Sequence, residues 1–114
     1  MNRLKTIILL SMIAALLVAC GKPSGMDDTT YKLGVKALEV MDAYNCADIT
    51  ADEANEKLQG IYERLNARNF SDDELTQEIQ NQSIIASVLG YQITMSSGGD
   101  LVADADSLRK KLNK

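Results

Sequence analysis

The chain has 114 residues, enough for one small domain with a short segment before it. Its 16 aspartate and glutamate residues outnumber its 12 lysine and arginine residues, which gives a formal net charge of −4. Nucleic acids and anionic lipid head groups bind basic surfaces, so we expect no nucleic-acid partner and no charge-driven adsorption to a membrane. Histidine is absent, which removes the most frequent general base and metal ligand.

The N-terminal stretch has the layout of a secretory signal peptide. Arg3 and Lys5 precede an apolar run over residues 7–17 that only Ser11 interrupts. This run is shorter than the ~20 residues that cross a bilayer, so a removed signal is favoured over a transmembrane helix.

The tetrapeptide Leu17-Val18-Ala19-Cys20, with Gly21 after it, resembles the lipobox of bacterial lipoproteins. The resemblance implies that residues 1–19 are a signal peptide and that Cys20 receives a diacylglyceryl thioether. It therefore makes the membrane a partner through two acyl chains, which suffice for stable anchoring. The expected location is the extracytoplasmic face of the cell membrane, or the outer membrane in a cell that has two.

Residues 20–27 are predicted to be a flexible, lipid-anchored tether. Residues 21–25 contain two glycines, a proline and a serine, a composition typical of spacers. Eight extended residues reach at most about 27 Å, so the domain would stay close to the membrane.

Residues 28–114 are predicted to form one helical domain, and its first two helices have clear patterns. The first should begin between residues 28 and 30 and end near Asn45 or Cys46, because apolar residues recur every three or four positions. The second should begin at Thr50, which forms a capping box with Glu53. Asn69 could take a left-handed conformation after its end.

A third helix should begin at Ser71, with a capping box and a hydrophobic contact from Phe70 to Leu75. Residues 91–95 alternate like a strand after Gly90, but no second strand is available to pair with them, so we expect the helix to continue. A shorter helix follows Asp100. The predicted fold class is all-α: a small bundle of three long helices plus a shorter C-terminal helix.

The third predicted helix carries an apolar segment between residues 84 and 95 that has two interpretations. It can be the central helix of the bundle, buried by the others. Alternatively, it can be a docking surface for a protein partner or the lining of an apolar ligand site. The candidate surface residues are Ile84, Ile85, Val88, Tyr91 and Met95.

Residues with catalytic or ligating patterns are scarce. The chain contains no glycine-rich phosphate loop, no Gly-x-Ser-x-Gly motif and no paired-cysteine metal site. Carboxylates at 52–56 and 72–74 fall in first helical turns, where the helix dipole accounts for them. We therefore assign no catalytic residue, metal or cofactor, and we interpret Cys46 as a small buried side chain near a helix end.

These patterns predict a protein that is not an enzyme. We expect a small membrane-anchored lipoprotein that acts as a non-catalytic protein-interaction or scaffolding module at the cell envelope, with a protein partner. One alternative is a carrier or sensor of an apolar ligand held between helices. A second is a cell-wall enzyme that uses a carboxylate pair drawn from Glu53 and Glu74.

Overall fold

The computed structural model describes residues 21–114. The predicted signal peptide, residues 1–19, and the predicted lipidation site, Cys20, lie outside the described residues. Within the described part, the chain forms four α-helices and one short 3₁₀ helix, with no strand. These elements are α2 (Asp28–Asn45), α3 (Ala51–Asn66), η1 (Asp72–Glu74), α4 (Leu75–Ser97) and α5 (Leu101–Lys111). The predicted all-α bundle is confirmed, and residues 91–95 are helical.

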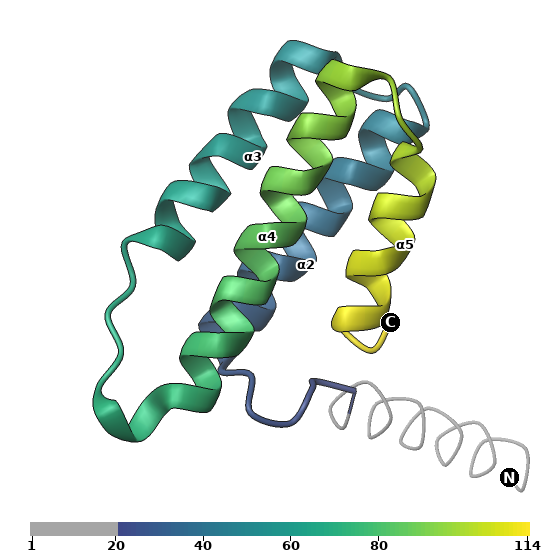
Figure 1. Cartoon of the computed structure of the whole chain (residues 1–114). Helices are drawn as coiled ribbons and strands as arrows, with labels where there is room; N and C mark the ends of the chain where they lie inside the picture. Colours follow the sequence, from purple (N-terminus) through teal and green to yellow (C-terminus); the bar gives the residue numbers. More distant parts are fainter. Residues whose placement is uncertain (1–20) are drawn as a thin grey trace, which may run out of the picture.

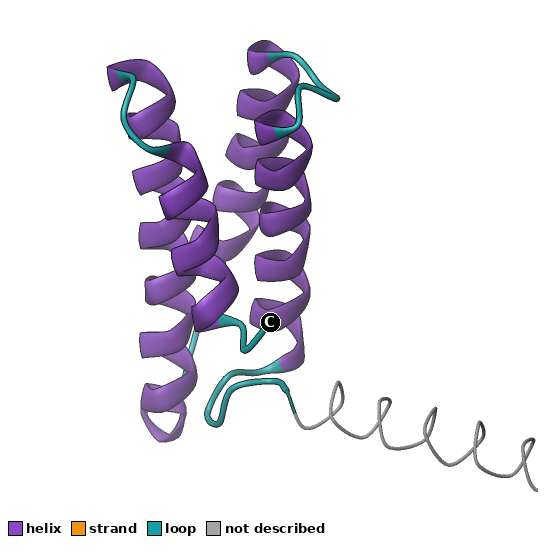
Figure 2. Cartoon of the chain, turned by 90° about the vertical axis from the view of Figure 1, so that its right-hand side faces the viewer, coloured by secondary structure: helices purple, strands orange, loops and turns teal. Residues whose placement is uncertain are grey.

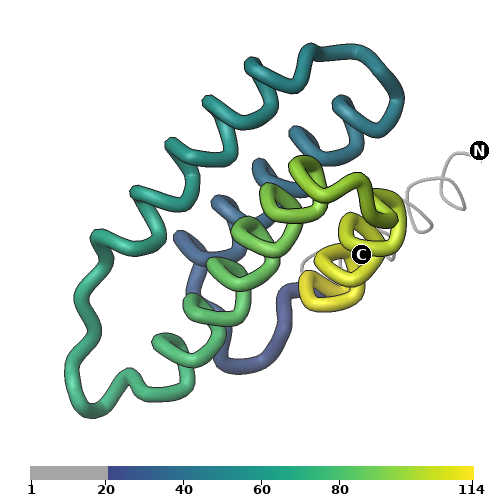
Figure 3. The backbone as a smooth tube through the Cα atoms, turned by 45° about the horizontal axis from the view of Figure 1, so that its top comes forward, coloured from purple at the N-terminus to yellow at the C-terminus, as the bar shows by residue number. Residues whose placement is uncertain are grey.

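The four helices run up and down around one core (Figure 1). Each packs against its neighbour in the chain, and α5 returns to pack against α2, so that the helices form a closed ring. In Figure 3, α4 and α2 lie between α3 on one side and the shorter α5 on the other. α2 and α4 each contact the three other helices, so together they form the centre of the fold.

Side-chain caps start the helices where the sequence predicts. The oxygens of Thr50 and Asp100 accept hydrogen bonds from backbone N–H groups three residues later, at 3.2 and 3.0 Å. Ser71 and Glu74 form a reciprocal capping box at η1, immediately before α4. Each cap satisfies N–H groups that the first turn of a helix leaves without a partner.

The end of α3 differs from its prediction. Asn69 does not take a left-handed conformation, since Ala47 and Asn113 are the non-glycine residues with positive φ in the described chain. The sequence also predicts a hydrophobic contact between Phe70 and Leu75. In the structure Leu75 is 61% exposed, and the Phe70 ring lies 4.8 Å from the guanidinium carbon of Arg68. The loop after α3 is therefore organised by Arg68, a long side chain whose partners are distant in the sequence.

The core is formed by one apolar face of each helix. It comprises Met26, Leu33, Ala37, Leu38, Met41, Leu58, Ile61, Leu65, Ile84, Ile85, Val88, Tyr91, Ala105, Leu108 and Leu112. Thr30 and Asn81 are the buried polar side chains of the described residues. Among residues 21–114, no helix combines the length and the apolar composition that crossing a bilayer requires.

Residues 21–27 are packed on the bundle instead of forming the predicted flexible tether. Met26 is only 4% exposed and belongs to the core, and its backbone N–H closes a turn by donating to the carbonyl of Pro23 at 3.2 Å. Gly25 has a φ of +82°, and a Cβ there would collide with Cγ2 of Thr76. The glycine thus permits a tight turn and a close approach to α4, uses that composition alone does not reveal.

Two further contacts hold this segment. Lys22 forms an ion pair with Asp28 at 2.6 Å, and the carbonyl of Ser24 accepts a hydrogen bond from Gln80 at 3.4 Å. Figure 2 shows the segment at the same end of the bundle as the C-terminus. The contacts of the described segment therefore begin at Lys22, two residues after Cys20 in the sequence.

Cys46 is exposed, contrary to the prediction that it is buried. It is the C-cap residue of α2, and the next residue, Ala47, has a φ of +60°. The chain therefore turns away from the core immediately after the last helical turn, and the cysteine side chain stays outside it.

Candidate functional site

The predicted surface residues of α4 lie on its buried side. Ile84, Val88 and Tyr91 have no exposed surface, Ile85 is 6% exposed, and Met95 is partly buried against the core. These residues therefore do not form an exposed docking surface in this fold. The other interpretation of the segment, the central helix of the bundle, agrees with their burial.

Tyr91 joins three helices near the end of the bundle that is distant from residue 21. Its hydroxyl donates a hydrogen bond to Oδ1 of Asn45 at 2.6 Å and also lies 3.2 Å from the carbonyl oxygen of Met41. The Asn45 amide in turn donates to the carbonyl of Leu101 at 3.3 Å. Burial raises the pKa of Tyr91 to about 12, so the hydroxyl is a neutral hydrogen-bond donor with a structural role.

A polar cluster occupies the opposite end of the bundle. The two terminal nitrogens of Arg68 donate to the two carboxylate oxygens of Asp27 at 2.8 and 2.5 Å, and one of them also donates to the Thr30 hydroxyl. These hydrogen bonds from Arg68 are the main reason that the pKa of Asp27 falls from 3.8 to about 2. The ionised pair fixes the residue that caps α2.

Asn81 completes this cluster from α4. Its amide oxygen accepts a hydrogen bond from the Thr30 hydroxyl at 3.1 Å, and its amide nitrogen donates to the carbonyl of Leu65 at 3.0 Å. The cluster thereby joins the segment before α2 to α2, to the last turn of α3 and to α4. Because its hydrogen-bonding groups are occupied by one another, we interpret it as a structural lock on residues 21–27.

The exposed apolar side chains of α4 form a second face, which the sequence pattern did not single out. Leu75, Ile79, Leu89 and Ile93 are 61%, 59%, 37% and 67% exposed, and Gln82 and Ala86 between them are exposed as well. At about 100° per residue, these six positions fall within about 40° of one line along the helix, roughly opposite Ile84 and Val88. We call the set Leu75, Ile79, Gln82, Ala86, Leu89 and Ile93 the outward face of α4.

Charge is almost absent from α4, although a quarter of the whole chain is charged. Glu78 is the one charged residue among the 23 residues of the helix. The sequence signal for the outward face is the spacing of its residues, which alternates between four and three positions. The core residues of the same helix follow a similar spacing. When one helix has apolar residues on two opposite faces, a simple hydrophobicity profile does not distinguish the two faces.

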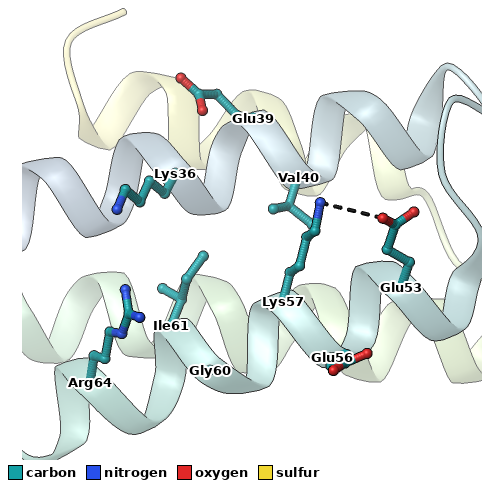
Figure 4. A pocket seen from close by; sticks show the side chains of 9 residues that line it. All are labelled: Lys36, Glu39, Val40, Glu53, Glu56, Lys57, Gly60, Ile61 and Arg64. Carbon is teal, nitrogen blue, oxygen red and sulfur yellow. Dashed lines mark ion pairs between the residues drawn. The ribbon is translucent and has the colours of Figure 1, made fainter.

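An open groove of about 600 Å³ lies between α2 and α3. Val40 and Ile61 extend toward each other and form an apolar floor with Gly60 (Figure 4). The walls carry both signs of charge, from Lys36, Lys57, Arg64, Glu39, Glu53 and Glu56. The groove faces away from α4 and α5, which lie behind α2 and α3 in this view. It is therefore on the opposite side of the bundle from the outward face of α4.

The carboxylates of the predicted enzymatic pair are not brought together. Glu53 lines the groove and lies 3.5 Å from Lys57, whereas Glu74 follows the far end of α3. The Ser71 backbone and hydroxyl donate to Glu74 and lower its pKa, the opposite of what a general acid needs. Within residues 21–114, no group of three acidic, cysteine or histidine residues is arranged to hold a metal ion.

Comparison with protein-family models, curated proteins and solved structures finds no match for this chain. Its candidate sites are therefore defined by their own geometry.

Proposed function

We propose that the protein is a lipid-anchored, non-catalytic interaction module on the extracytoplasmic face of the bacterial envelope. In this proposal, Cys20 carries the lipid and the outward face of α4 binds a protein. The observation that carries the proposal is the set of four large apolar side chains exposed on one uncharged helix face.

Exposed apolar residues are common on proteins, but they are usually scattered singly. Here Leu75, Ile79, Leu89 and Ile93 share one face over about five helical turns. The cores of protein interfaces are depleted in charged residues, and the outward face has the same composition. A helix face of this kind gains stability when another apolar surface covers it.

The packed segment before α2 supports the anchoring part of the proposal. Met26 and the Asp27–Arg68 ion pair hold this segment on the bundle up to Gly21. A lipid on Cys20 would therefore keep this end of the bundle at the membrane surface. The first turn of α4 lies at the same end, since Gly25 packs on Thr76.

Photo-crosslinking in cells that express the full chain tests this function. A photo-activatable amino acid at Ile93, on the outward face, should give a specific protein adduct in the membrane fraction. Val102 is the matched control because it is an apolar residue of α5 with similar exposure, 59% against 67%. No adduct at Ile93 beyond the level at Val102 would contradict the proposal, and release of the Cys20→Ser chain from the membrane would test the anchor.

A second candidate function is suggested by the α2–α3 groove. Its apolar floor, with acidic and basic side chains around it, suits an amphiphile with a polar head group, which would make the protein a carrier or sensor. A Cβ added at Gly60 would meet no atom within 4 Å, so a side chain can begin there, and we expect Gly60→Leu to occupy part of the groove. Native mass spectrometry should detect a co-purifying amphiphile that this variant loses; detection of none would exclude the carrier function.

A further inference from the structure

We propose that the partner of the outward face of α4 is a second copy of this chain, packed in parallel through the same face. This inference rests on the proposed function and specifies its partner. Two membrane-anchored copies would then form a symmetric dimer in which Leu75, Ile79, Leu89 and Ile93 of each copy meet their counterparts.

The identity of the residues at each position supports a two-stranded contact. The outward face follows the 4-3-4-3-4 spacing of a heptad seam. In heptad notation Leu75 and Leu89 occupy d positions, and Ile79 and Ile93 occupy a positions. Isoleucine at a with leucine at d is the combination that favours parallel dimers over higher oligomers.

The one polar residue of the seam favours the parallel orientation. In a parallel pair Gln82 faces Gln82 of the other copy, and each amide can donate to and accept from the other. In an antiparallel pair with the apolar residues aligned, Gln82 would face Ala86, and the buried amide would lose its hydrogen-bond partner. Parallel packing therefore gives the amide of Gln82 a hydrogen-bond partner, and antiparallel packing does not.

The absence of charge makes the face compatible with a copy of itself. Glu78, at the edge of the seam, is the one charged residue of α4, so the seam itself brings no row of like charges together; the acidic residues Asp72 and Asp73 of η1 lie before its first residue. A strongly basic or acidic partner would find no complementary charges on this face. The position of residue 21 agrees with parallel order as well, because both anchors then lie at the same end of the dimer.

The size of the contact indicates why the membrane matters. From Leu75 to Ile93 the seam is about 27 Å long and about 10 Å wide, which gives roughly 300 Å² for each copy. A standard stable interface buries about 800 Å² on each side, so this seam alone predicts a weak dimer in free solution. Confinement of both copies to one membrane raises their effective concentration and compensates for the small area.

Disulfide crosslinking of the full chain in membranes tests the arrangement. Ser96 continues the seam as the next d position and is exposed. In the parallel dimer, a Ser96→Cys variant in a Cys46→Ser background should form a disulfide-linked dimer on mild oxidation. In an antiparallel dimer the two Ser96 positions would be about 36 Å apart, far beyond the roughly 4.4–6.8 Å that a disulfide spans between Cα atoms.

Matched controls separate specific pairing from collision. Ser107→Cys is the first control, because this position on α5 is exposed and lies outside the seam. The Cys46→Ser chain without an added cysteine is the second control, and it measures any crosslinking through a free thiol at Cys20. Adding Ile93→Glu should reduce the Ser96 crosslink at least tenfold, whereas Val102→Glu should leave it unchanged. Both replaced side chains are more than half exposed, so neither change should unfold the chain.

Crosslinking at Ser96 no stronger than at Ser107, or crosslinking that survives Ile93→Glu, would overturn the dimer. The photo-crosslinking experiment then separates the two proposals. An adduct at Ile93 with a different protein, without a Ser96 disulfide, would retain the interaction module and reject the second copy. No adduct and no disulfide would reject both.

Discussion

The two faces of α4 have similar apolar residues in opposite environments. Ile84 on the inward face has no exposed surface, whereas Ile93 on the outward face is 67% exposed, and both are isoleucines of the same helix. The inward face is covered by α2, α3 and α5. The difference shows that the apolar content of this helix exceeds what the bundle uses, so the fold and the proposed interface are encoded on opposite sides of one element.

The largest effect is expected on the inward face. Ile84→Ala should lower the free energy of unfolding by about 3 kcal/mol, because it removes buried methyl groups and leaves a cavity. Urea denaturation followed by circular dichroism measures this change. A loss below about 1 kcal/mol would mean that the core around α4 can collapse or is loosely packed, which would weaken the contrast between the two faces.

Helix positions could be predicted from the sequence because their signals are local. Capping residues such as Thr50 and Asp100 act on N–H groups three residues away, and the heptad-like core pattern repeats within each helix. The packed segment at 21–27 could not be predicted in this way. Its contacts join Asp27 to Arg68 and Ser24 to Gln80, residues that are 41 and 56 positions apart.

The candidate site was predicted only in part, for a related reason. The sequence identified the apolar segment of the third helix and the need to cover it, but a helix that is apolar on two sides does not reveal which side faces the core. The choice depends on where α2, α3 and α5 lie around α4. The residues predicted as a surface, including Val88 and Tyr91, belong to the core, and their neighbours Leu89 and Ile93 form the exposed face.

The Asp27–Arg68 ion pair, in the polar cluster at one end of the bundle, should give the next largest effect. Asp27 has a folded-state pKa of about 2, below its ordinary value of 3.8, so the folded protein binds fewer protons than the unfolded chain in this range. This difference contributes about 2 kcal/mol of stability above about pH 4, which is lost as the pH falls through about 2.

Urea denaturation of the wild type and of Asp27→Asn between pH 7 and pH 2 checks this expectation. The variant should be less stable by about 2 kcal/mol at pH 7, and the two curves should converge near pH 2. Curves that stay parallel over the whole range would show that the ion pair with Arg68 does not stabilise the fold.

A smaller effect is expected at the other end of the bundle. Tyr91→Phe keeps the ring but removes the hydroxyl that donates to Asn45, and it should cost about 1 kcal/mol. Tyr62→Phe is the matched control, since the Tyr62 hydroxyl has no hydrogen-bond partner among the described residues and its ring is partly buried. Equal losses in the free energy of unfolding for the two variants would show that the hydrogen bond from the Tyr91 hydroxyl does not stabilise the fold.

The smallest effect on monomer stability is expected on the outward face. Ile93→Ala removes the same number of atoms as Ile84→Ala, but these atoms are mostly in contact with water in the isolated chain. The free energy of unfolding, measured in dilute solution where a weak dimer dissociates, should therefore change by less than about 0.5 kcal/mol. A loss above about 1 kcal/mol would mean that Ile93 is packed within the monomer. In that case the outward face would be part of the core, and it would not be available to a second copy.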